Sequence, residues 1–161
     1  EKYLLDWGKK CKVKILILRL PLIVGSNPPG NLGKMINGIK RGTYFSIGGG
    51  KARKCMVLAE DVAKLITECP DVSGIYNLTD GYHPSFAELE STICEQLKRP
   101  KPFNMSLSFA KLLGKIGDFI PVFPVNSDII NKITQDLTFS DLKARQKLGW
   151  NPSRVIDKWR I

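Results

Sequence analysis

The sequence has few residues of the kinds that bind metals or cross-link a chain. Among its 161 residues are one histidine, His83, and four cysteines, at positions 11, 55, 69 and 94. Zinc sites need clustered cysteine and histidine ligands, so these scattered positions argue against a metal centre. Cysteines with no clustered spacing indicate free thiols, and we therefore expect a protein of the reducing cytoplasm.

Long apolar runs are also missing. The most apolar stretch, residues 13–24, is interrupted by Lys14, Arg19 and Pro21. It is shorter than the ~20 apolar residues that cross a bilayer, and the N-terminal residues carry no signal-peptide pattern. We therefore expect no membrane partner.

The chain lacks the common motifs of nucleotide chemistry as well. Gly25 and Gly30 have the spacing of a mononucleotide phosphate loop, but Asn31 stands where that loop needs lysine. The glycines at 48–50 are followed by Arg53 where the dinucleotide motif needs its third glycine. No tyrosine is followed by lysine four residues later, and no serine lies in a Gly-x-Ser-x-Gly turn. These residues therefore predict neither a phosphate loop nor a catalytic base or nucleophile.

Positive charge, by contrast, is abundant. The chain has 25 basic and 15 acidic residues, which gives a net charge of +10. The basic residues are spread out, and no aromatic residues alternate with them as they do in proteins that bind single-stranded nucleic acid. The charge is explained by a solvated surface or by an anionic small-molecule substrate, and a nucleic-acid-binding module is the alternative.

Predicted strands and helices alternate along the chain, which indicates an α/β fold. The strand at 13–20 is apolar on both faces, as is typical of a parallel sheet covered by helices on both sides. Ser85 and Glu88 have the spacing of a capping box, and Asp61 is expected to cap the helix at 62–69. The other predicted strands lie at 44–47, 56–58 and 74–77, and the other helices at 32–42, 84–100, 106–120 and 140–149.

The first residues read as the end of a helix. Tyr3, Leu4 and Trp7 fall at helical spacing, and no capping residue precedes them. This pattern leads us to expect a fragment of a longer protein.

Two motifs occur in an order that is typical of one enzyme family. The segment VLAEDVA, residues 57–63, is similar to that family's Val-x-Asp-Val-Ala element, and KARQKLGWNP, residues 143–152, to its Lys-Ala-x-x-x-Leu-Gly-Trp-x-Pro element. With these motifs the chain resembles the second half of extended short-chain dehydrogenase/reductases. It is most similar to the NAD-dependent epimerases and dehydratases that act on nucleoside-diphosphate sugars, and the likeness covers nearly the whole chain.

The resemblance implies a fold: the C-terminal portion of a Rossmann-type parallel sheet with a small, mostly helical substrate-binding cap. Residues 1–102 would belong to the dinucleotide-binding α/β domain with a substrate-binding insert, and residues 103–161 to the cap. The glycine fingerprint and the Tyr-Lys pair of the family would lie upstream. We therefore expect this chain to be inactive by itself.

The resemblance also implies binding roles. The cofactor is NAD or NADP, bound mainly by upstream residues, and its nicotinamide ring would lie against Leu20, Pro21, Leu22 and Ile23. The substrate is a nucleoside-diphosphate sugar, of the uridine diphosphate type, with Asn31 and Leu32 on its diphosphate and Phe45 and Ile47 beside its base. Arg53 or Lys54 would supply the cation that clamps the diphosphate, although arginine and lysine bind phosphate differently. Simpler roles stay open: a helix cap for Asn31, core packing for Phe45, and a solvated pair for Arg53 and Lys54.

The complete protein would then be a homodimeric epimerase or dehydratase. In the family, a hydride passes from the sugar to NAD, a keto intermediate forms, and the hydride returns, with a tyrosine as base. A non-catalytic dinucleotide-binding sensor of the same fold and a basic nucleic-acid-binding module are the alternatives.

Overall fold

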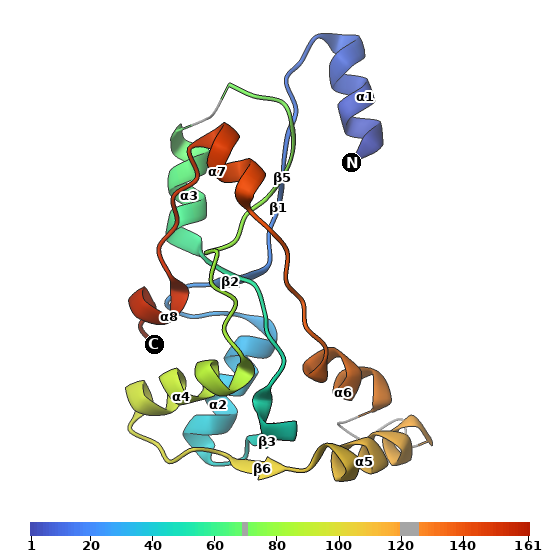
Figure 1. Ribbon diagram of the computed structural model, residues 1–161, viewed down its shortest axis with the longest axis vertical. Coiled ribbons are helices and arrows are strands. Elements are labelled where there is room, and N and C mark those ends of the chain that lie inside the picture. Colours follow the sequence, from blue (N-terminus) through green and yellow to red (C-terminus); the bar gives the residue numbers. More distant parts are fainter. Residues whose placement is uncertain (69–70, 120–125) are drawn as a thin grey trace. The chain divides into compact units, whose positions relative to one another are not determined.

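The computed structural model describes residues 1–68, 71–119 and 126–161 (Figure 1). The chain divides into two compact units. Unit 1 comprises Glu1–Ser26, Cys55–His83 and Thr138–Arg160, and unit 2 comprises Asn27–Lys54, Pro84–Leu137 and Ile161. Each unit is assembled from separate stretches of sequence, whereas the predicted boundary between residues 102 and 103 is a single cut. The predicted boundary separates a dinucleotide-binding domain from a substrate-binding cap. Because it assigns binding roles rather than compact units, it stays a prediction.

Among its described residues, unit 1 contains two pairs of parallel strands. Strand β1 (Leu16–Arg19) pairs with β5 (Gly74–Asn77), and β2 (Leu22–Val24) pairs with β4 (Met56–Leu58). The registers align Leu16 with Gly74 and Leu22 with Met56. The helices of this unit are α1 (Lys2–Cys11), α3 (Ala59–Glu68), α7 (Leu142–Leu148) and α8 (Val155–Lys158).

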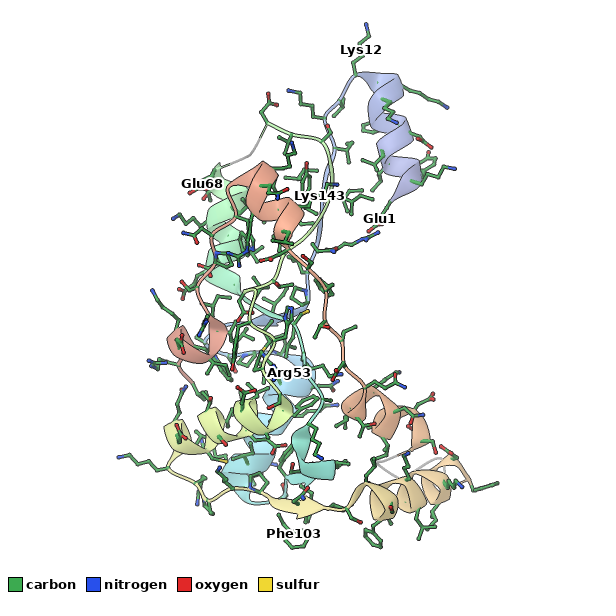
Figure 2. All side chains as sticks on the ribbon, viewed as in Figure 1. Glu1, Lys12, Arg53, Glu68, Phe103 and Lys143 are labelled. Carbon is green, nitrogen blue, oxygen red and sulfur yellow. The ribbon has the colours of Figure 1, made fainter. Side chains whose placement is uncertain are left out.

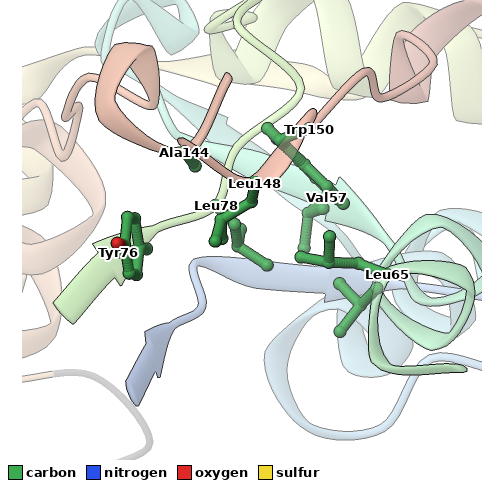
Figure 3. Close-up of a cluster of buried hydrophobic side chains, with 8 residues drawn as sticks. Val57, Leu65, Tyr76, Leu78, Ala144, Leu148 and Trp150 are labelled. Atoms are coloured by element: carbon green, nitrogen blue, oxygen red, sulfur yellow. The ribbon is translucent and has the colours of Figure 1, made fainter. Parts of the chain in front are cut away.

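The core of unit 1 is formed by side chains from the β4–α3 segment, from β5 and from the segment around α7 (Figure 3). Strand β4 is buried at all of its positions, which is why its sequence is continuously apolar rather than alternating. Leu16 and Leu18 of β1 pack against this core. Its buried members are Val57, Val62, Leu65, Tyr76, Leu78, Ala144, Leu148 and Trp150.

Two sequence expectations in unit 1 need correction. The predicted strand at 13–20 is shorter, because only Leu16–Arg19 pairs with a neighbour and Val13 is exposed. Asp61 does not cap α3, because the helix begins two residues earlier, at Ala59. Its carboxylate instead accepts a 2.8 Å hydrogen bond from the backbone N–H of Ser153. Asp61 thus connects α3 to the segment between α7 and α8.

In the part of unit 2 that the structure describes, β3 (Phe45–Ile47) pairs in parallel with β6 (Phe103–Met105). A 3-10 turn, η1 (Gly48–Gly50), follows β3. The helices are α2 (Gly30–Arg41), α4 (Phe86–Leu97), α5 (Leu107–Phe119) and α6 (Ser127–Thr134). Helix α4 begins with the predicted capping box: Ser85 accepts from the backbone of Glu88, and the Glu88 carboxylate accepts from the backbone N–H of Ser85.

The predicted α/β class is confirmed, since helices alternate with strands and every strand pair among the described residues is parallel. None of the helices in this part of the chain combines the length and the apolar character that a membrane crossing demands.

Candidate functional site

The segment Ala52–Lys54 in unit 2 is held from both sides by backbone hydrogen bonds. On one side, the N–H of Lys54 donates to the carbonyl of Pro84 at 3.0 Å, and that of Phe86 donates to Ala52 at 3.0 Å. On the other side, the N–H of Leu137 donates to the carbonyl of Arg53 at 2.9 Å. The segment is therefore fixed between the start of α4 and the chain that follows α6.

Lys54 directs its charge toward helix α6. Its Nζ donates to the carbonyl of Lys132 at 2.8 Å and to that of Gln135 at 2.6 Å, at the C-terminal end of α6. The same Nζ lies 5.6 Å from the centre of the Phe86 ring. Burial lowers the pKa of Lys54, and the nearby Asp136 carboxylate opposes that shift. Lys54 thus caps the negative end of a helix dipole.

Arg53 differs from its neighbour because its side chain is exposed (labelled in Figure 2). Its backbone is fixed by the bond from Leu137, and its own N–H donates to the Asp136 carboxylate at 2.7 Å. An exposed guanidinium on a fixed backbone suits bidentate binding of a phosphate or carboxylate. Of the two predicted clamp residues, Arg53 is therefore the more exposed.

A pocket of about 210 Å³ lies beside this segment in unit 2. Ile47, the last residue of β3, lines it together with Gly50 and Ala52 from the segment that follows β3. Phe86 and Glu90 line it from α4. Ligand pockets usually measure ~300–1,000 Å³, so this one can hold a single ring or sugar rather than a whole nucleotide sugar. The remaining lining residues are Tyr44, Gly48, Lys51, Leu107, Ile133 and Thr134.

A buried carboxylate forms the polar part of the pocket wall. Glu90 is only 6% exposed, and it accepts a 3.1 Å hydrogen bond from the hydroxyl of Tyr44. Ser46 is a second hydrogen-bond partner. Burial raises the pKa of Glu90, and burial together with the Glu90 charge raises the pKa of Tyr44. The pocket therefore combines apolar walls with one acidic group whose charged form is disfavoured.

The other residues predicted for the substrate are distributed over several elements. Asn31 is exposed in the first turn of α2, one residue after its start, so it is not the helix cap. Leu32 is 2% exposed and belongs to the buried face of α2. A leucine whose side chain is buried in this way can offer a ligand only its backbone N–H.

Phe45 and Ile47 line different pockets. Ile47 belongs to the pocket beside Ala52, whereas Phe45 lines a second one of about 460 Å³ between the ends of α2 and α4. Phe45 is about half exposed and is paired in register with Phe103 on β6, so it is not a core residue. Basic residues also line this second pocket: Lys40, Arg41, Arg99 and Lys101.

The residues predicted for the cofactor lie in unit 1. Leu20 and Pro21 follow the carboxyl end of β1, and Leu22 and Ile23 belong to β2. Leu20 and Ile23 are exposed. In open parallel sheets, dinucleotides bind beyond the carboxyl ends of the strands, and exposed apolar side chains at such an end suit a flat nicotinamide ring.

Sequence reasoning missed two contributors to this region. Helix α6 was not predicted, although Asn126 caps it by accepting from the N–H of Ile129 at 2.9 Å, and asparagine before an apolar-periodic run signals a helix start. Glu90 was read only as part of a helix. No sequence signal shows that it is more deeply buried than Glu95, an exposed glutamate on the same helix.

Comparisons with known proteins agree with the predicted resemblance. No protein-family model matches the chain. UDP-glucose 4-epimerase of Vibrio cholerae is 22% identical over 168 aligned positions, which cover 98% of this chain and 48% of that protein. The UDP-glucose 4-epimerase of Thermotoga maritima, solved with UDP-glucose, superposes with a TM-score of 0.67 at 17% identity, over 94% of this chain and 45% of that one. The UDP-glucose 4-epimerase of Thermus thermophilus, solved with NAD, gives a TM-score of 0.65 at 17% identity, over 94% and 45%.

These similarities confirm the resemblance to NAD-dependent epimerases and the Rossmann-type α/β fold that the sequence predicted. The chain spans about half the length of the relatives it matches.

Proposed function

We propose that this chain is the nucleotide-sugar-binding part of an NAD(P)-dependent epimerase that acts on a UDP-sugar. The observation that carries the proposal is the sequence similarity to a UDP-glucose 4-epimerase, which extends over 98% of the chain rather than over one motif. The aligned region includes the irregular segments between β3 and α4 as well as the strands. Several of the residues that line the pocket beside Ala52 lie in these segments.

In this proposal, Arg53 holds the diphosphate of the substrate. Its guanidinium is exposed on a backbone that is fixed by Leu137 and Asp136, and a net charge of +10 favours an anionic ligand. Asn31 adds two amide donors in the first turn of α2, where the positive end of the helix dipole also favours phosphate. Lys54 contributes indirectly, because it holds α6 against the segment that carries Arg53.

The pocket next to Arg53 would receive a ring of the ligand. Its volume of about 210 Å³ suits one base or one sugar, and Ile47 and Phe86 provide apolar walls. Phe45 lies on the same strand as Ile47 and lines the second pocket, so β3 offers two apolar surfaces to a nucleotide.

The dinucleotide would lie against unit 1, with the backbone of Leu20 to Ile23 facing the nicotinamide ring. The parallel pairing of β1 with β5 and the exposed Leu20 and Ile23 fit this role. When bound, the nicotinamide accepts a hydride from the sugar and returns it. This chain's own part is to orient the sugar and to keep water from the reacting carbon.

The experiment is calorimetric titration of the 161-residue protein with UDP-glucose, UDP and NAD. We expect UDP-glucose and UDP to bind and to raise the melting temperature, because a ligand of the folded state stabilises it by mass action. NAD should bind more weakly, since the resemblance assigns most of its contacts to upstream residues. The protein incubated with UDP-glucose and NAD is expected to form no epimerised product.

The same titration distinguishes the alternatives. A protein that binds NAD but neither UDP nor UDP-glucose would be a dinucleotide sensor rather than a substrate-binding part. A protein that ignores all three ligands, but binds random DNA with a steep dependence on salt, would be a nucleic-acid-binding module. Either result would overturn the proposed function.

A further inference from the structure

Helix α5 turns its small residues toward the protein and its large apolar residues toward solvent. Its buried positions are Ala110, Gly114 and Gly117. A Cβ atom on Gly114 would lie 3.2 Å from the backbone of Ser127 on α6, so this face packs closely. Phe109, Leu112 and Ile116 are 51%, 55% and 42% exposed. At 3.6 residues per turn, these three lie within about 60° of one another and on average about 130° from the small residues.

This arrangement is unusual for a helix of a globular protein. An amphipathic helix normally packs its large apolar side chains inward, because their removal from water drives folding. Here the packed face contributes little apolar area, and the face with most of it is left exposed. The exposed stripe therefore needs a further partner.

The chain segment that contains this stripe is rich in positive charge. Between residues 98 and 117 the sequence has five basic residues and no acidic one. Among the described residues, the ion pairs involve other side chains than these five. Lys111 and Lys115 lie beside the stripe on α5, and the others precede β6: Lys98, Arg99 and Lys101.

The adjoining strand continues the apolar surface. Phe103 on β6 is 74% exposed, and its side chain projects outward from the strand (Figure 2). Met105 is partly buried, and α5 begins two residues later, at Leu107. An exposed aromatic ring next to an exposed apolar helix face is typical of segments that enter the headgroup region of a bilayer.

We propose that β6 and α5 attach this protein to the surface of an anionic lipid membrane. The lipid-binding surface consists of Phe103, Phe109, Leu112 and Ile116, with Lys111 and Lys115 at its border. The apolar side chains would enter between the lipid headgroups, and the lysines would contact anionic headgroups. Helix α5 has 13 residues, so it lies on the membrane and does not cross it. The sequence expectation of no membrane partner rested on the lack of a crossing segment, which surface attachment does not require.

Charge distinguishes a lipid surface from a second copy of the chain. Each copy carries a net charge of +10, and a symmetric contact through α5 would bring Lys111 and Lys115 of both copies close together. Like charges at such a contact repel, whereas an anionic leaflet attracts them. The observations therefore favour the membrane.

The test is vesicle binding by the 161-residue protein. Sedimentation with vesicles of phosphatidylcholine alone is compared with sedimentation with an equimolar mixture of phosphatidylcholine and phosphatidylglycerol. We expect binding to the mixed vesicles only. Lys111→Gln with Lys115→Gln should weaken binding about 30-fold, from ~1 kcal/mol per lysine near the surface. Phe109→Gln with Leu112→Gln should weaken it by on the order of 100-fold, because two large apolar groups no longer leave water.

Two matched variants control for total charge and apolar content. Lys9→Gln with Lys10→Gln removes the same charge from the exposed end of α1, and Ile66→Gln removes an exposed apolar side chain from α3. Both should bind the mixed vesicles nearly as wild type does, and circular dichroism should show that all variants are folded. Absence of binding to the mixed vesicles would overturn the proposal. The proposal would also be overturned if the lysine variant lost binding while the Phe109 and Leu112 variant bound like wild type. The same holds if light scattering showed a dimer that the Phe109 and Leu112 changes dissociate.

Discussion

The hydroxyl of Tyr44 donates a 3.1 Å hydrogen bond to the carboxylate of Glu90, which is buried on the face of α4 that lines the pocket beside Arg53. Two hydroxyl groups, those of Tyr44 and Ser46, compensate for the loss of water around this carboxylate. They do so incompletely, because the pKa of Glu90 remains above its ordinary value of 4.5 through burial. The folded state therefore disfavours the charged form of Glu90, and the two hydroxyl groups only reduce this cost.

This relationship predicts a pH-dependent stability. Because the folded state raises the pKa of Glu90, it retains a proton that the unfolded chain has already lost above about pH 4.5. Stability is then greatest below the unfolded pKa and is lost as the pH rises through the folded pKa. Glu90→Gln removes this loss while keeping an oxygen that accepts from Tyr44. We expect the variant to exceed wild type in free energy of unfolding at neutral pH and to lose this advantage below pH 4.5.

Urea unfolding of both proteins across this pH range measures the effect. Glu95→Gln is the control, because Glu95 is an exposed carboxylate on the same helix. A difference between Glu90→Gln and wild type that stays constant with pH would show that the carboxylate does not titrate in the predicted way.

Two neighbouring glycines of η1 are expected to differ in how much stability is lost when each is replaced by alanine. Gly49 and Gly50 both have positive φ, 72° and 61°. A Cβ atom at Gly50 would lie 2.7 Å from the backbone nitrogen of Ala87, whereas at Gly49 the nearest atom is 4.0 Å away, at the end of the Lys51 side chain. Gly49→Ala should cost about 1–2 kcal/mol for its backbone conformation, and Gly50→Ala about 3 kcal/mol or more.

Thermal unfolding of the two alanine variants checks this contrast. Equal losses would mean that conformation alone requires the glycines. The larger loss at Gly50 would mean that this glycine serves the close approach of η1 to α4, and so the pocket wall, rather than a phosphate loop.

The helix starts and ends that depend on residues close together in the sequence could be predicted from the sequence. The capping box of Ser85 and Glu88 and the end of α7 at Gly149 need only local spacing and a residue that tolerates positive φ. The direction of Lys54 could not be predicted in this way. Its partners at the C-terminal end of α6 are 78 and 81 residues away, so its role depends on where the chain returns. Asp61 was misjudged for the same reason, since its partner Ser153 is 92 residues away.

A second buried carboxylate supports the C-terminal part of unit 1. Asp80 is buried, and its two oxygens accept from the backbone N–H groups of Tyr82 at 2.9 Å and Val155 at 3.0 Å. Asp80→Asn leaves one oxygen and places an amide donor against the other N–H. We expect a loss of about 1–3 kcal/mol, the usual cost of a buried donor without a partner.

Guanidinium unfolding of Asp80→Asn measures this loss, and Asp157→Asn, an exposed change on α8, provides the control. If Asp80→Asn matched the control, the two hydrogen bonds would not support the attachment of α8.

Arg53 and Lys54 provide the sharpest test of the proposed site, because the two adjacent cations are expected to have different roles. Arg53 would bind the diphosphate, whereas Lys54 would stabilise the contact with α6. Arg53→Ala removes an exposed guanidinium, so it should weaken binding of UDP about tenfold or more. Lys54→Met removes two hydrogen bonds to α6 but keeps the apolar length of the side chain. It should cost about 1–3 kcal/mol of stability and weaken binding less than Arg53→Ala does. Calorimetric titration with UDP and thermal unfolding of both variants measure the two effects separately. The reverse pattern, with Lys54 required for binding and Arg53 dispensable, would mean that Lys54 leaves α6 when the nucleotide binds. The diphosphate clamp would then be Lys54 instead of Arg53.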